Sequence, residues 1–170
     1  MAILHLAPEF CLQKKLSRLQ NVHYVTANLD PTQASVSMDV QFTPFRNASF
    51  DCVLCCHVLE HVPDDQKAMR EMFRILKPGG WAILQVPIDN NRDETFEDVK
   101  IASPEEQERV FGGRDHVRIY GQDYKRRLAD AGFTVQFDSY IKELPAKVIF
   151  RNGLSTEDIL LVSKSSNCNI

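Results

Sequence analysis

The segment from Phe50 to Ile88 constrains the fold more than any other part of the chain, because it has the pattern of one strand, helix, strand unit. Residues 51–56 and 81–86 are two almost wholly apolar runs, as expected of strands buried on both faces of a parallel sheet. A helical pattern that opens at Pro63 separates them. The unit therefore predicts an α/β sheet with a right-handed crossover.

The predicted crossover helix has clear start and stop signals. Two aspartates follow Pro63, where negative charge favours a helix N-terminus. Lys77 is expected in the last turn, and residues 78–80, Pro-Gly-Gly, are expected to end the helix. The apolar side chains recur at spacings of three and four and predict one buried stripe: Met69, Met72, Phe73 and Leu76.

Three polar side chains follow the first apolar run directly. They are His57, Glu60 and His61, and we expect them at the carboxyl end of that strand. Ligands of open α/β sheets bind at this edge. The sequence therefore predicts a binding site beside these three residues.

The segment resembles the middle of the class I S-adenosylmethionine-dependent methyltransferases. Residues 57–62 read His-Val-Leu-Glu-His-Val and residues 76–80 read Leu-Lys-Pro-Gly-Gly, both typical of the small-molecule branch of that family. The resemblance covers about residues 2–163 and implies a Rossmann-like doubly wound sheet, mostly parallel, with one antiparallel strand near the C-terminus. We expect a single domain over residues 1–164 and a disordered tail over 165–170.

The rest of the chain supplies the other elements of such a sheet. Strands are expected over residues 2–6, 22–27, 34–40, 133–140 and 158–163, and helices over 9–19 and 122–131. Ser103, Pro104 and Glu106 form a capping pattern that predicts a short helix ending before Gly112. The acidic stretch 89–100 is interpreted either as a solvated loop or as a lid over a substrate pocket.

Composition narrows the class of partner. The net charge of −3 gives no electrostatic footprint for nucleic acid, so a small-molecule acceptor is the expected partner. The sequence has neither an apolar run long enough for a membrane span nor a secretory signal, which predicts a cytoplasmic protein without a membrane partner. Cys52 and Cys55 have a redox-like or metal-like spacing, but buried strand thiols are the simpler interpretation.

The resemblance implies an S-adenosylmethionine site at the end of the first strand. Leu6, Ala7 and Pro8 occupy the turn that is glycine-rich in the family, and this chain has no glycine there. Ala7 is expected to replace a glycine only if its φ stays negative. Cys56 and His57 are expected to line the same site from the next parallel strand.

The resemblance also implies cofactor contacts for residues at the ends of the second and third predicted strands. Asn28 stands where the family usually has an acidic residue that binds the ribose, and Asp30 is an alternative. Both are also common turn formers before a proline. Asp39 and Val40 are followed by Thr43-Pro44-Phe45, and together they resemble a family element in which the aspartate accepts a hydrogen bond from the adenine amino group. The alternative role for Asp39 is a strand-end cap.

The acceptor side is less constrained by the sequence. His57 and His116 are candidate catalytic bases, because a histidine takes up a proton near neutral pH, although His57 also fits a helix-start position. Glu60, His61, Arg118 and Tyr120 are expected to bind the acceptor, with an ion pair to the acidic stretch as the alternative for Arg118. A metal held by these histidines and Glu60 is a second interpretation; the favoured one has no metal.

Methyl transfer to a small acceptor is the leading functional hypothesis. The main alternative is an inactive, methyltransferase-like binding or assembly module, motivated by the glycine-free turn and by Asn28. Family members usually carry an N-terminal covering element, so we expect a fragment, a truncated product or a site completed by a second copy or a partner chain. A nicotinamide-dependent oxidoreductase is disfavoured because the chain has no Gly-x-Gly-x-x-Gly.

Overall fold

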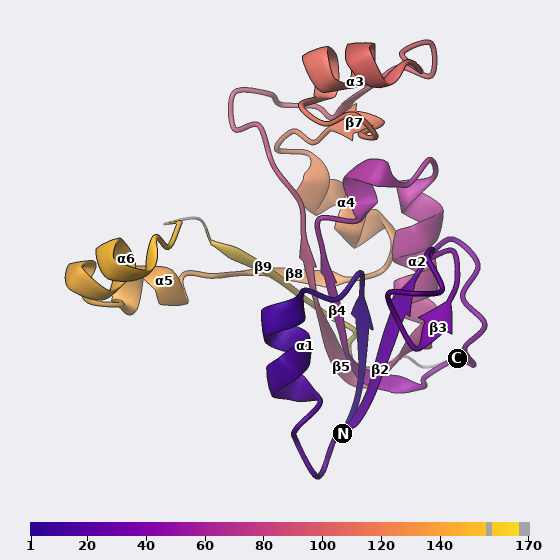
Figure 1. Cartoon of the computed structure of the whole chain (residues 1–170), viewed down its shortest axis with the longest axis vertical. Coiled ribbons are helices and arrows are strands. Elements are labelled where there is room, and N and C mark those ends of the chain that lie inside the picture. The colour runs from indigo at the N-terminus through magenta and orange to yellow at the C-terminus, as the bar shows by residue number, and fades with distance from the viewer. Residues whose placement is uncertain (156–157, 167–170) are drawn as a thin grey trace.

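A seven-stranded sheet organises the chain (Figure 1). The computed structural model describes residues 1–155 and 158–166, and the strand order is β3-β2-β1-β4-β5-β9-β8. Only β9 runs antiparallel to its neighbours. The strands are β1 Ala2–Leu6, β2 His23–Asn28, β3 Val36–Ser37, β4 Phe50–Cys56, β5 Leu76–Gln85, β8 Thr134–Asp138 and β9 Ile159–Ser163. The predicted fold class is confirmed.

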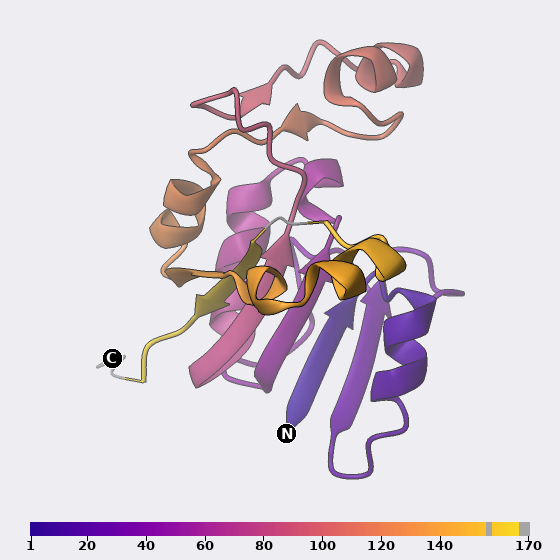
Figure 2. The same ribbon diagram turned by 90° about the vertical axis from the view of Figure 1, so that its left-hand side faces the viewer.

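Helices cover both faces of the sheet (Figure 2). On one face lie α1 (Phe10–Leu16), α5 (Tyr140–Glu143) and α6 (Ala146–Asn152), and on the other lie α2 (Asp65–Ile75) and α4 (Tyr124–Asp130). The main core lies on the α2 and α4 side, where Met69, Met72 and Leu128 are fully buried. A smaller cluster around Ile3, Cys52 and Leu54 packs against α1.

A separate cap stands over the carboxyl ends of the parallel strands (Figure 1). It contains β6 (Phe96–Glu97) and β7 (Arg118–Ile119), which form a short antiparallel pair, and α3 (Pro104–Phe111), which lies in the connection between them. The Ser103 side chain accepts from the Glu106 N–H, as the predicted cap requires. Part of the acidic stretch is therefore paired in a strand and anchored beside the site.

The boundary between α2 and β5 differs from the prediction. The helix ends at Ile75, and the Leu-Lys-Pro-Gly-Gly segment is the start of β5, with Leu76 paired to Phe50. Pro78 disfavours helical geometry at the residue before it, so the chain extends early. Lys77 then lies beyond the helix and its ammonium contacts the Asp51 carboxylate at 2.8 Å.

Two further elements are shorter than predicted. The third strand pairs only over β3, because the Ser35 hydroxyl accepts from the Thr26 N–H and takes the place of a ladder partner. The first helix stops at Leu16, and Leu19 is bonded three residues back, in a tighter turn.

The segment after β8 contains two helices that the sequence interpretation missed. Both α5 and α6 stand away from the strands on the α1 side of the sheet, at the left of Figure 1, and Pro145 and the left-handed Gly153 bound α6. These are ordinary start and stop signals. Of the predicted disordered tail, residues 167–170 lie outside the described residues. No helix in the described part of the chain is long and apolar enough to cross a bilayer.

Glu71 gives α2 a pH-dependent attachment to the loop before β4. Its carboxylate accepts from the Arg74 guanidinium at 2.7 Å and from the Thr43 backbone N–H at 3.0 Å. These hydrogen bonds, that of Arg74 first, lower the pKa of Glu71 from 4.5 to about 2. A carboxyl with a lowered folded-state pKa stabilises the protein above its unfolded pKa, and loses that contribution as pH falls toward the folded value.

We therefore expect Glu71→Gln to lower the free energy of unfolding by roughly 2–3 kcal/mol at pH 7. The difference from the unsubstituted protein should shrink as pH falls from 4.5 to about 2. Urea unfolding at pH 7 and pH 3 measures it. Glu108→Gln, which removes a carboxylate that is 57% exposed, is the control and should show little change at either pH. A Glu71→Gln difference that is independent of pH would contradict the assignment.

Candidate functional site

A cavity of about 440 Å³ opens at the carboxyl ends of β1, β2 and β4. Seven of the predicted site residues line it: Leu6, Ala7, Asn28, Asp39, Val40, His57 and His61. Its volume is in the range of small-molecule and cofactor sites. The sheet edge expected from the sequence thus coincides with a formed cavity.

The turn after β1 adopts the backbone conformation that usually requires glycine. Ala7 has φ +43°, so the condition set for this alanine, a negative φ, is not met, and Ala7 itself adopts the left-handed conformation. Its N–H is bonded to the Ala27 carbonyl at 2.8 Å, which fixes the turn against β2. Pro8 follows outside the cavity lining. A left-handed alanine costs about 1–2 kcal/mol, so surrounding contacts must hold it.

A buried polar cluster beneath this turn supplies such contacts. His5 is fully buried; its two ring nitrogens lie 2.8 Å from the Tyr24 hydroxyl and 2.6 Å from a Glu9 carboxylate oxygen. Burial, and then the Glu9 charge, raises the pKa of Tyr24 to about 12. The cluster ties β1, β2 and the start of α1 together. His5 and Glu9 were assigned no role from the sequence.

Relief of the strain at Ala7 is measurable. Ala7→Gly should raise the free energy of unfolding by up to about 1 kcal/mol, because the relieved strain exceeds the extra unfolded-state entropy of glycine. Ala129→Gly on the exposed face of α4 is the matched control and should lower it by about 1 kcal/mol. Thermal and urea unfolding of both variants measure the difference. Equal destabilisation of the two would contradict the strained turn.

Asn28 and Asp39 face the cavity from adjacent positions, whereas Asp30 does not line it. The Asp30 carboxylate accepts from Thr32 N at 2.8 Å and from Gln33 Nε2 at 2.8 Å, and the Thr32 bonds hold its pKa below the ordinary value. Asp30 is therefore a turn former in this structure. Asp39 accepts from the Gln41 backbone and side chain, which shapes the rim of the cavity.

His57 directly follows β4, at the mouth of the cavity. It has φ +53° and a side chain that is 64% exposed, and its Nδ1 lies 3.3 Å from Glu60 Oε1. Such a strained, accessible residue is typical of a functional position. Cys56, directly before it, is not among the lining residues, and burial raises the pKa of its thiol to about 11. Cys52 and Cys55 pack in different clusters on opposite sides of the sheet.

Arg118 and Tyr120 both have hydrogen-bond partners inside the protein, and Arg118 also lines a second cavity, beneath α3. The Arg118 guanidinium is buried; it donates to the Leu59 carbonyl at 2.8 Å and to the Pro63 carbonyl at 2.9 Å, and it pairs with Glu97. The Tyr120 hydroxyl donates to Asp65 at 2.8 Å. Both residues hold the turn that presents Glu60 and His61, and Arg118 forms the ion pair that was the alternative interpretation.

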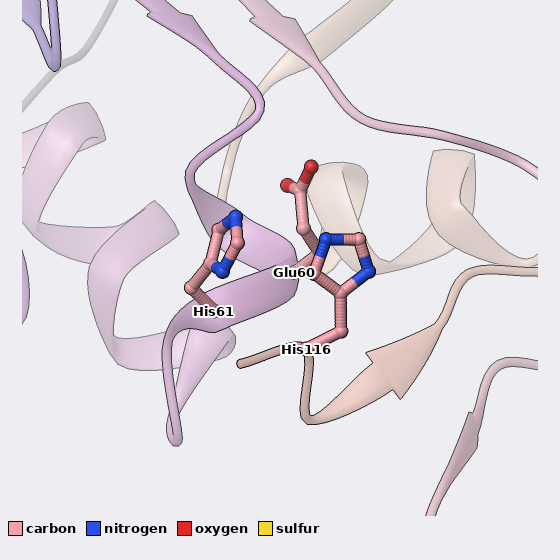
Figure 3. Close-up of side chains that lie close together, drawn as sticks. All are labelled: Glu60, His61 and His116. Carbon is pink, nitrogen blue, oxygen red and sulfur yellow. The ribbon is translucent and has the colours of Figure 1, made fainter. Parts of the chain in front are cut away.

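Glu60, His61 and His116 converge beside the cavity (Figure 3). The 3-10 turn η1 (Leu59–His61) carries the first two, and His116 comes from the cap before β7. The Val117 N–H donates to the Glu60 carbonyl at 2.9 Å and holds the cap strand against this turn. Glu60 and His116 also line a second cavity of about 530 Å³ beneath α3. The three residues thus stand between two cavities.

Several lining residues were not predicted. Among them are Met38, Gln41 and Asp115, which line the first cavity. Met38 and Gln41 flank the predicted Asp39 and Val40 in the sequence, so their place in the cavity wall could have been predicted from these neighbours. Asp115 reaches the cavity only because the cap folds over η1, and no local pattern encodes that.

Part of the chain matches a known protein family. Residues 10–84 match a family described as methyltransferase domain. The ubiquinone/menaquinone biosynthesis C-methyltransferase UbiE of Vibrio cholerae is 43% identical over 60 residues, which are 35% of this chain and 19% of that protein. The chain therefore aligns with about a fifth of the length of this relative.

Solved structures extend the likeness over the whole fold. The putative methyltransferase in complex with the Haloferax volcanii Trm112 methyltransferase activator superposes with a TM-score of 0.66 at 17% identity, over 96% of this chain and 82% of that chain. A putative methyltransferase from Bacillus halodurans gives 0.61 at 17% identity, over 96% and 92%. These likenesses show that the chain has the Rossmann-like methyltransferase fold, and the family match covers residues 10–84 of it.

Proposed function

We propose that this chain transfers a methyl group from S-adenosylmethionine to a small-molecule acceptor. The observation that carries the proposal is the cavity at the ends of β1, β2 and β4, which is lined by six of the nine residues expected to hold this cofactor. When bound, the cofactor supplies a methyl group already activated on a sulfonium. Positioning of donor and acceptor then supplies much of the rate.

In this proposal each rim residue has a distinct role. The backbone at Leu6 and Ala7 packs against the methionine part of the cofactor, and Asn28 accepts from the ribose hydroxyls. Asp39 accepts from the adenine amino group, beside the apolar side chain of Val40. Support comes from their common position on the cavity wall and from the exclusion of Asp30.

The acceptor is proposed to occupy the second cavity, beneath α3. Its volume of about 530 Å³ suits a small molecule, and Ile88 and Phe111 give it apolar walls. His57 lies at the mouth of the first cavity and His116 lines the second. A proton released by an acceptor hydroxyl or amine would pass to one of these rings.

An inactive binding module is the weaker candidate, because the cavity and its polar rim are present. The V. cholerae relative is a C-methyltransferase by name, which favours a small acceptor.

A second copy or a partner chain that completes the site stays a prediction. The Haloferax volcanii neighbour was solved with an activator partner. Light scattering of the purified protein tests it, and a strict monomer with methyl-transfer activity would contradict it. The cytoplasmic location also stays a prediction.

Calorimetric titration with S-adenosylhomocysteine tests the proposal without knowledge of the acceptor. We expect saturable binding with one ligand per chain. No heat change up to about 1 mM ligand, equivalent to a binding free energy weaker than about −4 kcal/mol, would contradict the proposed activity for this chain.

A further inference from the structure

We propose that Glu60, His61 and His116 form a binding site for one divalent transition-metal ion. One ligand atom from each residue lies within 4.8 Å of the other two, a separation that one ion can bridge after small side-chain movements (Figure 3). The sequence interpretation had favoured a site without metal. The site is argued from this arrangement and does not depend on the proposed methyl transfer.

Two buried polar atoms in this cluster have no hydrogen-bond partner among the described residues. They are Glu60 Oε2 and His61 Nδ1, and Glu60 is only 2% exposed. Asp115 Oδ2 lies 3.2 Å from His61 Nδ1 but not in hydrogen-bonding geometry. An unpaired buried carboxylate oxygen is costly, because it has lost water and gained nothing. A bound cation would satisfy it directly.

The surrounding contacts orient the ligands as metal sites require. His116 Nδ1 lies 3.2 Å from the Phe111 carbonyl oxygen. A carbonyl oxygen can only accept, so this hydrogen bond assigns the proton to Nδ1. In that neutral tautomer Nε2 keeps its lone pair for a metal ion. Metal-bound histidines almost always donate their second ring N–H in this way. His57 Nδ1 lies 3.3 Å from Glu60 Oε1 and orients the carboxylate.

Gly113 makes room for the His116 ring. A Cβ at this position would lie 2.4 Å from His116 Cδ2 and 2.6 Å from Nε2, closer than real contacts allow. Any side chain at Gly113 would therefore displace the ring. This glycine offers a way to disturb the site without removing a ligand.

Two imidazole nitrogens and one carboxylate oxygen suit Zn²⁺ and neighbouring first-row ions better than Mg²⁺ or Ca²⁺. Three protein ligands leave a coordination position open, as in catalytic zinc sites. Because Glu60 and His116 line the second cavity and His61 lines the first, the ion would lie between them. An oxygen of a molecule in either cavity would be within its reach. With His116 bound to the ion, His57 is the ring that remains to take a proton from the acceptor.

Titration of chelator-treated protein with Zn²⁺ by calorimetry, and with Co²⁺ by visible absorption, tests the site. We expect one ion per chain and cobalt bands typical of low coordination number. His116→Gln and Glu60→Gln should each weaken Zn²⁺ binding at least about tenfold. His23→Gln, at an exposed position on β2, is the control and should bind as the unsubstituted protein does.

If a ligand variant fails to fold, Gly113→Ala tests the metal site instead. It should weaken Zn²⁺ binding while all three ligands are kept, whereas equal affinity would overturn the site. Absence of Zn²⁺ binding, or equal losses in His23→Gln and His116→Gln, would also overturn it. S-adenosylhomocysteine binding is measured on the same samples, so failure of the metal site and failure of the proposed function give different results.

Discussion

Replacement of Asp65 by alanine is expected to lower the free energy of unfolding by about 3–5 kcal/mol. The Asp65 side chain is buried, and its two oxygens accept from Arg127 at 2.6 Å and from the Tyr120 hydroxyl at 2.8 Å. Removal of the carboxylate would leave a largely buried guanidinium without its main acceptor, and would leave the buried Tyr120 hydroxyl with only the longer bond to the Leu59 carbonyl, at 3.2 Å. The cost of these unpaired groups exceeds that of the lost contacts themselves.

The same change should disturb the site. Tyr120 and Arg118 both bond the Leu59 carbonyl, and η1, which begins at Leu59, carries Glu60 and His61. Asp65 also lies 4.0 Å from Arg118, so its loss weakens the whole support under the turn. Asp65→Ala is therefore expected to reduce ligand binding as well as stability.

Urea unfolding at pH 7 measures this effect. Glu94→Ala is the matched control, because it removes a carboxylate that also pairs with an arginine, Arg126, but both side chains are more than 60% exposed. That variant should lose less than about 1 kcal/mol. Similar losses in the two variants would show that the Asp65 network does not stabilise the fold as described.

The second large effect concerns cofactor affinity. Asp39→Ala should weaken S-adenosylhomocysteine binding by about 10–100-fold, the value of one hydrogen bond to a charged acceptor. Asp39→Asn keeps an oxygen that can accept from the Gln41 N–H, and so preserves the turn while removing the charge. It should show a smaller but clear loss. Calorimetric titration of both variants gives the affinities.

Asp30→Ala serves as the control for this prediction. Asp30 is also an aspartate near the end of β2, but Thr32 and Gln33 occupy its carboxylate and it does not line the cavity. Its loss should leave the affinity within about twofold, a change below 0.5 kcal/mol. If Asp30→Ala weakens binding while Asp39→Ala does not, the adenine and ribose assignments are wrong.

The central part of the fold could be predicted because its signals are local. An apolar run in β4, a helical stripe on α2 and the apolar run of β5 each follow from residue spacing within one element. Two of the errors have an identified physical cause, the first a tertiary contact and the second a local restraint. Ser35 replaces a ladder bond, which shortens β3, and Pro78 extends the chain before the expected end of α2.

The candidate site could be predicted only in part, because tertiary contacts determine the conformation or burial of several of its residues. Asn28, Asp39 and His57 sit at strand ends, and the sheet topology brings them to one cavity. The conformation of Ala7 depends on tertiary support that no spacing reveals. Likewise, the burial of Arg118 follows from the cap folding onto η1, and a sequence pattern cannot distinguish a buried guanidinium from an exposed clamp.

A crystal structure of the protein with S-adenosylhomocysteine tests the central claim most directly. We predict ligand density in the cavity at the ends of β1, β2 and β4, with the adenine beside Asp39 and the sulfur on the His57 side. Density that fills this cavity in that orientation would establish the cofactor site. Ligand bound elsewhere, or the adenine beside His57 and far from Asp39, would contradict the account.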